Sequence, residues 1–191
     1  MIPARLNPFA VDRVLRIRYR TRELAREQIL QRLAAMQYRA AIVGPDGTGK
    51  TTLLEDLESP LRALGFEIRH ARLDRATRLL PADQRRSLLG GLGPRHVILF
   101  DGADHMPRPL WPVFRFRTRC AGGLIITSHR TGLLPTLLAT DTSVELLAEL
   151  VRELLGPDFE SVAPLLPQLF QRHRGNLRDC LRELYDTFAS R

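Results

Sequence analysis

The sequence predicts an α/β domain with an open parallel sheet of about five strands, followed by a small all-helical segment. Three observations support this fold class. Short apolar runs alternate with helical patterns from residue 23 to residue 142, as in parallel sheets whose strands are joined by helices. Two of these runs end in polar residues, and ligands bind at the carboxyl edge of such a sheet. From Ser143 onwards only helical patterns remain.

The length and pattern of the chain predict a core domain with a small appendage. The 191 residues suffice for one α/β domain with a buried core. We expect residues 1–142 to form the core domain together with an N-terminal arm. Residues 143–191 should form a helical lid.

The strands are predicted from short apolar or alternating runs. They cover residues 38–43, 66–73, 97–101, 123–130 and 139–142. The helices are predicted from apolar residues that recur every three or four positions. They cover residues 23–37, 53–64, 75–89, 109–119, 143–156, 159–173 and 176–188. Pro60 should kink the second helix or split its last turn, and Pro81 should interrupt the third. Ser143 and Asn176 are good N-caps for two of the C-terminal helices.

A glycine-rich loop follows the first predicted strand. It fits the pattern G-x-x-x-x-G-K-[ST] of loops that bind the phosphates of nucleoside triphosphates. The predicted phosphate-binding residues are Gly44, Pro45, Asp46, Gly47, Thr48, Gly49, Lys50, Thr51 and Thr52. The glycines let main-chain N–H groups curl around a polyphosphate. Lys50 is expected to reach the β- and γ-phosphates, and the Thr51 hydroxyl to bind Mg²⁺.

Asp101 ends a run of four apolar residues, 51 positions after Lys50. A carboxylate at the tip of a buried parallel strand can complete the magnesium site that Thr51 begins. We therefore predict Thr51 and Asp101 as the metal-binding residues. The alternative is an aspartate that only caps the following turn.

Hydrolysis of a triphosphate needs a group that orients the attacking water. Gly102 follows Asp101 and cannot serve, so Asp104 is the nearest candidate, and His105 the next. Thr127 or Ser128, at the end of the fourth predicted strand, could hydrogen-bond the γ-phosphate or the water. The alternative is that these are ordinary loop residues.

The charge of the chain invites an anionic partner such as DNA. Its net charge is +8, and Lys50 is the only lysine among its 29 basic residues. An arginine-rich composition accounts for the same charge without any such partner. In residues 109–119 aromatic side chains alternate with arginines. We favour core packing of Trp111 and Phe114 over stacking on nucleic acid.

Two cysteines, 60 residues apart, exclude a metal knuckle or a redox pair and favour a reducing cytoplasm. No apolar run approaches the roughly 20 residues of a membrane span. The first residues lack the apolar segment of a secretory signal. We therefore expect a cytoplasmic protein without a membrane segment.

At these motifs the chain resembles the AAA+ ATPases. Gly44 to Thr51 departs from the common form GPPGTGKT only at Asp46. Val97 to Asp101 is similar to the second nucleotide motif of that family, and Thr127-Ser128 to the sensor at the end of the next strand.

The C-terminal segment adds a further match. Gly175-Asn176-Leu177-Arg178 is similar to the second sensor, whose arginine contacts the γ-phosphate. With Asn7-Pro8-Phe9 near the start, the layout is most similar to small origin-initiator and transposition-regulator ATPases.

The resemblance implies a three-layer P-loop NTPase fold and the cofactors ATP and Mg²⁺. It also implies hydrolysis coupled to the assembly of several copies on a partner, often DNA. Two departures matter. The acidic residue that normally follows the magnesium aspartate is Gly102 here, and Arg130 is only a loose candidate for the arginine that a neighbouring subunit supplies. These departures favour a slow ATP-dependent switch over rapid hydrolysis.

Two alternatives stay open. Gly44 to Thr52 also resembles the phosphate loop of thymidylate kinases, but those enzymes carry an arginine beside the central aspartate and an arginine-rich lid. The third hypothesis is a nucleotide-binding interaction module that does not hydrolyse ATP, and Gly102 is the reason for it.

Overall fold

The computed structural model describes residues 7–10 and 26–189. Residue contacts divide the chain into two units, which are described separately. The first is an α/β unit that contains residues 26–44 and Gly49–Thr140 of the described chain. The second is a helical unit with residues 7–10, Pro45–Thr48 and 141–189. The sequence placed the boundary at 142/143, two residues later, and grouped the N-terminal arm with the core.

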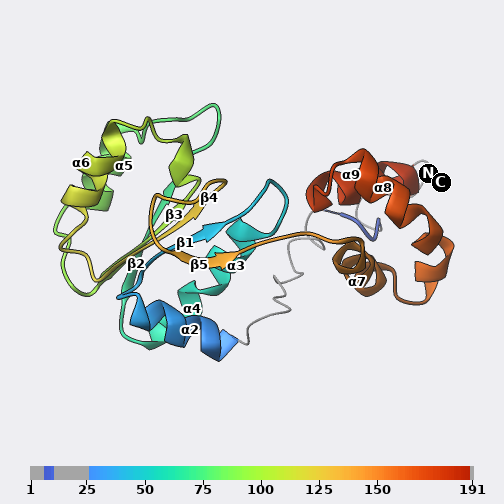
Figure 1. The fold of residues 1–191 in the computed structure, drawn as a ribbon, viewed down its shortest axis with the longest axis horizontal. Helices are drawn as coiled ribbons and strands as arrows, with labels where there is room; N and C mark the ends of the chain where they lie inside the picture. Colours follow the sequence, from blue (N-terminus) through green and yellow to red (C-terminus); the bar gives the residue numbers. More distant parts are fainter. Residues whose placement is uncertain (1–6, 11–25, 190–191) are drawn as a thin grey trace. The chain divides into compact units, whose positions relative to one another are not determined.

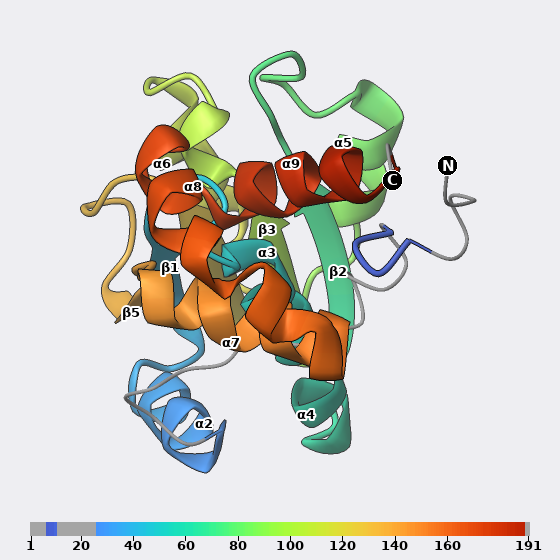
Figure 2. The ribbon, with the colours of Figure 1, turned by 90° about the vertical axis from the view of Figure 1, so that its right-hand side faces the viewer.

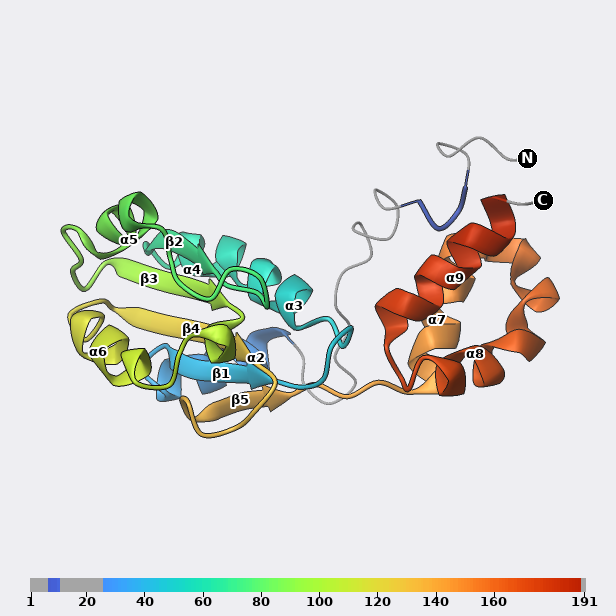
Figure 3. The same cartoon turned by 90° about the horizontal axis from the view of Figure 1, so that it is seen from above.

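The α/β unit is built on a sheet of five parallel strands (Figure 3). The strands are β1 (Arg39–Val43), β2 (Glu67–Arg72), β3 (His96–Asp101), β4 (Gly123–Ser128) and β5 (Thr136–Ala139). Their order across the sheet is β2-β3-β4-β1-β5. The predicted parallel sheet of five strands is confirmed, and β4 lies between the two strands whose tips carry the predicted site.

Helices cover both faces of the sheet, as Figure 1 shows. The helices on one face are α2 (Arg26–Ala35), α3 (Lys50–Asp56) and α4 (Glu58–Ala63); those on the other are α5 (Ala82–Leu89) and α6 (Leu110–Arg117). Side chains alternate between the faces along each strand. Ile42 and Leu99 pack in the core beneath α2, α3 and α4, whereas Phe100 packs in the other core. Trp111 and Phe114 are buried in that second core, as predicted.

In its described residues, the helical unit contains three α-helices, which are labelled in Figure 2, and two short 3₁₀ segments. They are α7 (Val144–Leu155), η3 (Gly156–Ser161), η4 (Ala163–Leu165), α8 (Leu166–Arg172) and α9 (Leu177–Ala189). Both predicted N-caps are confirmed. Ser143 Oγ accepts a hydrogen bond from Leu146 N, and Asn176 Oδ1 accepts from Arg178 N and Asp179 N.

Residues 7–10 pack within the helical unit. Asn7 is fully buried, and its Nδ2 donates to the carbonyl of Tyr185 at 2.9 Å. The ring of Phe9 meets that of Phe188 edge to face. Because Phe9 buries its ring in the core of this unit, the segment does not group with the sheet, contrary to the expectation from the sequence.

The helices that contain Pro60 and Pro81 in the sequence prediction are both interrupted, as expected, and prolines also shift several predicted helix ends. The predicted helix over 53–64 breaks at Leu57, and Pro60 lies in the first turn of α4, where a missing N–H costs nothing. The helix predicted from residue 75 begins only at Ala82, because Pro81 disfavours a helical conformation at the residue before it. In the helix predicted over 159–173, the residues before Leu166 lie in the 3₁₀ segments η3 and η4, and α8 begins only at Leu166; Pro164 and Pro167 lie in the first turns of η4 and α8.

The fifth strand lies earlier in the chain than the sequence predicts. It covers Thr136–Ala139 instead of 139–142. Leu137 and Leu138 are buried there against the neighbouring core residues, and this burial fixes the position of the strand. Among the described residues, no helix combines the length and apolar character that crossing a membrane requires.

Candidate functional site

The glycine-rich loop leaves β1 at Gly44, whose N–H donates to the carbonyl of Ser128. Gly47 and Gly49 have φ angles of 76° and 82°, in the left-handed region that favours glycine. Within the loop, Thr48 Oγ1 donates to the carbonyl of Pro45 at 2.9 Å. Pro45 and Asp46 are exposed at its tip. The loop therefore has the backbone conformation for which its glycines are suited.

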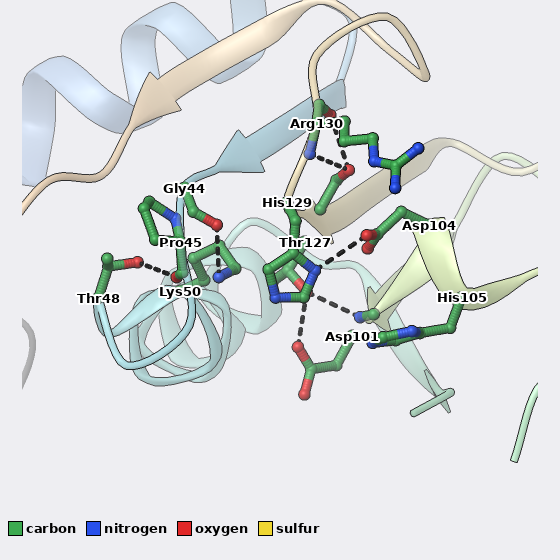
Figure 4. A network of polar contacts seen from close by, with 12 residues as sticks. Gly44, Pro45, Thr48, Lys50, Asp101, Asp104, His105, Thr127, His129 and Arg130 are labelled. Atoms are coloured by element: carbon green, nitrogen blue, oxygen red, sulfur yellow. Dashed lines mark hydrogen bonds and ion pairs between the residues drawn. The ribbon is translucent and has the colours of Figure 1, made fainter. Parts of the chain in front are cut away.

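Lys50 begins α3 and is buried, with 8% of its surface exposed. Its Nζ donates to the carbonyl of Gly44 at 2.7 Å, so the ammonium lies over the start of the loop (Figure 4). A buried ammonium is costly unless polar groups surround it. The position is therefore suited to an anionic ligand that would share this charge.

Thr51 and Asp101 meet although 50 residues separate them. Thr51 Oγ1 lies 3.2 Å from each carboxylate oxygen of Asp101. A hydroxyl and a carboxylate are hard oxygen donors of the kind that Mg²⁺ prefers. This pair fits the predicted magnesium site. Arg72 is a second neighbour, with its Nε 3.7 Å from Asp101 Oδ2.

Thr127 organises the carboxylate at the tip of β3. Its hydroxyl donates to Asp101 Oδ1 at 2.6 Å and accepts from the N–H of Gly102 at 2.7 Å. Thr127 is buried, with 1% of its surface exposed. In this structure its hydroxyl thus positions Asp101, in addition to any contact with a phosphate.

Gly102 has a structural reason to be glycine. Its φ angle is 73°, and an added Cβ would lie 2.2 Å from the carbonyl oxygen of Leu73 and 3.0 Å from Cδ2 of His105. Backbone occupies the space that any side chain would need. The chain therefore has no room for an acidic residue directly after Asp101.

Ser128 and Arg130 close a tight turn after β4. Ser128 Oγ donates to the carbonyl of Arg130 at 2.7 Å and accepts from its N–H at 3.0 Å. Arg130 itself is exposed. The turn carries His129, whose Nδ1 lies 2.9 Å from Asp104 Oδ2 (Figure 4).

No role for His129 was predicted from the sequence. The available signal was its place immediately after the polar end of a buried strand, at the same sheet edge as Asp101. Asp104 was predicted, and the structure adds the imidazole that its carboxylate meets. His105 lies on the same short 3₁₀ turn as Asp104, η2 (Ala103–His105).

Arg178 lies in the helical unit, on the first turn of α9, and is exposed. The two acids that could pair with it locally have other partners. Asp179 accepts from Asn176 Nδ2, and Glu183 meets Arg172 and His173. A contact of Arg178 with a nucleotide stays a prediction.

Comparison with known proteins adds information about the fold. No protein-family model matches the sequence, and no curated protein matches it either. A solved structure of a lysine-to-arginine mutant of RuvB from Thermotoga maritima is similar, with a TM-score of 0.51 at 17% sequence identity. The likeness covers 84% of this chain and 61% of that one. It confirms the predicted α/β fold, a parallel sheet of five strands with helices on both faces and a helical C-terminal region.

Proposed function

We propose that this protein binds ATP with Mg²⁺ and acts as a slow, AAA+-like ATPase or ATP-dependent switch. The observation that carries the proposal is that Lys50 contacts the start of the glycine-rich loop while Thr51 meets Asp101, at the carboxyl edge of one parallel sheet. An ammonium, a loop of main-chain N–H groups and a hydroxyl–carboxylate pair are the groups that a magnesium-bound triphosphate requires.

Each residue has a definite task in this proposal. The loop from Gly44 to Gly49 cradles the phosphates, and Lys50 neutralises charge on the β- and γ-phosphates. Thr51 and Asp101 would hold Mg²⁺, which supplies further neutralisation of the phosphate oxygens. Thr127 fixes the orientation of Asp101.

Asp104, together with His129, is the group proposed to orient the attacking water. Their contact of 2.9 Å fixes the imidazole against the carboxylate, which is the arrangement of a base and its orienting group. Because Gly102 cannot carry a carboxylate, the pair stands further along the chain than the usual acid, and this supports slow hydrolysis. Arg178 is proposed to contact the γ-phosphate, as the resemblance implies.

Phosphate release from ATP, measured with and without DNA, tests the proposal. Asp104→Asn should leave the Kd for ATP within about twofold, since the variant keeps every phosphate-binding group. It should slow phosphate release about 100-fold, a typical contribution of general acid–base catalysis. Asp83→Asn is the matched control, because it removes an exposed carboxylate on α5.

The outcomes separate the hypotheses. If Asp104→Asn releases phosphate at the same rate as the parent, the proposed role of Asp104 is wrong. Binding of ATP without any release of phosphate would favour the non-hydrolysing module. Transfer of phosphate to a nucleoside monophosphate would favour the kinase.

The proposed partners are DNA or a protein, with further copies of the chain. If the arginines bind DNA, affinity should fall steeply with salt, because phosphate contacts release counterions. Undetectable DNA binding would favour a protein partner. The net positive charge would then reflect an arginine-rich composition and not a DNA-binding role.

A further inference from the structure

A group of side chains of the types that ligate metals lies beside the proposed magnesium site. Asp104 and His105 come from η2, which follows β3, and His129 comes from the turn after β4 (Figure 4). Each offers one ligand atom, and these three atoms lie within 4.8 Å of one another. None of the three is needed to hold the phosphate loop or the pair Thr51–Asp101.

The two carboxylate oxygens of Asp104 differ in their hydrogen bonding. Oδ2 meets His129 Nδ1 at 2.9 Å, but Oδ1 is buried and has no hydrogen bond within the part of the chain that the structure describes. A buried carboxylate oxygen without a donor is costly, and such an atom calls for an explanation. A bound cation would compensate it.

The surrounding backbone holds the three side chains in place. The absence of a Cβ on Gly102 leaves room for the His105 ring, which meets the His129 ring edge to face at 5.6 Å. The hydrogen bonds between Ser128 and Arg130 fix the turn that carries His129. The side chains of Asp104 and His129 are 13% and 27% exposed, so an ion has a route from solvent.

We propose that Asp104, His105 and His129 bind a divalent transition-metal ion, with Zn²⁺ as the best fit. Two imidazoles and one carboxylate suit Zn²⁺, whereas Mg²⁺ prefers oxygen ligands throughout. His129 Nδ1 lies 2.9 Å from Asp104 Oδ2, so the imidazole is already beside the carboxylate whose other oxygen, Oδ1, has no hydrogen bond among the described residues. Three protein ligands leave a fourth position for water.

The ion would also affect the proposed hydrolysis. Because it engages Asp104 and His129, it would withdraw both from the attacking water, and Zn²⁺ should slow phosphate release. This consequence rests on the proposed function. Binding of the ion does not, so the test below omits nucleotide.

Equilibrium dialysis of the full chain against Zn²⁺, with excess Mg²⁺ and no nucleotide, tests the site. All variants carry Cys120→Ser, since Cys120 is an exposed thiol that could bind zinc by itself. We expect one tightly held Zn²⁺ per chain. His105→Gln and His129→Gln should each weaken it at least about tenfold, the smallest effect typical of changes around a metal centre. Co²⁺ in place of Zn²⁺ should give visible absorption bands that the same variants lose.

The matched controls are His70→Gln and His96→Gln. Each of these histidines faces a carboxylate, that of Glu58 or Glu67, and neither belongs to a group of three ligands among the described residues. Both controls should bind Zn²⁺ like the parent. Circular dichroism checks that every variant is folded.

Two results would overturn the proposal. One is no uptake of Zn²⁺ by the folded parent in excess Mg²⁺. The other is an equal loss of Zn²⁺ in the controls and in the His105 and His129 variants. A chain that binds ATP and takes up no Zn²⁺ would contradict the metal site alone, whereas Zn²⁺ uptake without ATP binding would contradict only the proposed function.

Discussion

The carboxyl ends of β1 and β3 both contribute to the candidate site. They differ in how far apart in the sequence the residues lie that hold each functional side chain in place. At β1 the contact that places the lysine is local, since Lys50 Nζ bonds the carbonyl of Gly44 six residues earlier. At β3 they are distant, because Asp101 meets Thr51 and Thr127 from 50 and 26 residues away. A motif can therefore be identified at the first tip from its letters, whereas the second tip depends on which strands are neighbours.

Replacing Lys50 should produce the largest effect, and it tests the contacts at the end of β1. In Lys50→Ala the Kd for ATP should rise about 10- to 150-fold, because charged hydrogen bonds to phosphate contribute about 1.5–3 kcal/mol. Isothermal titration calorimetry with Mg²⁺ and ATP measures this. Arg62→Ala is the control, since it removes an exposed positive charge on α4 and should bind ATP like the parent. Equal binding by Lys50→Ala would remove the basis of the proposed function.

Gly102→Ala tests the end of β3, where the contacts join residues that are far apart in the sequence. The variant should lose about 2–3 kcal/mol of unfolding free energy, from a positive φ and from the overlap of a Cβ with the Leu73 carbonyl. Gly91→Ala is the matched control, because Gly91 has a φ of 60° with nothing within 4 Å of an added Cβ, and about 1 kcal/mol is expected.

Urea denaturation measures both glycine variants. Equal losses would mean that crowding around Gly102 does not matter. By the same argument, Gly102→Glu should destabilise the chain instead of restoring rapid hydrolysis.

Thr127→Val should have the smallest effect of the three. It removes the hydroxyl between Asp101 and the Gly102 N–H, and a buried donor left without a partner costs about 1–3 kcal/mol. Urea denaturation measures the loss, and a higher Mg²⁺ requirement for ATP binding should accompany it. Thr187→Val is the control, because that hydroxyl is exposed and bonds the carbonyl of Glu183 on its own helix. No difference between the two variants would contradict the positioning role of Thr127.

Much of the fold was predictable because its signals are local. Apolar runs located β1, β3 and β4 to within two residues at each end. The failures have identifiable causes. Residues 139–142 look as extended as 136–139, and only burial of Leu137 and Leu138 decides for the latter. Residues 75–81 have a helical composition, but Asp74 Oδ1 accepts hydrogen bonds from Ala76 N and Thr77 N and holds a turn there.

Residues adjacent in the chain were enough to specify the phosphate loop, the parallel sheet and the presence of Asp101 at a strand tip. Packing between distant segments was needed to place β4 between β1 and β3, which brings Thr127 beside Asp101 and His129 beside Asp104. The same packing leaves residue 102 no space for a side chain. Hydrophobic patterns specify which residues are buried, but they do not specify which strands are neighbours, and the second half of the site depends on that order.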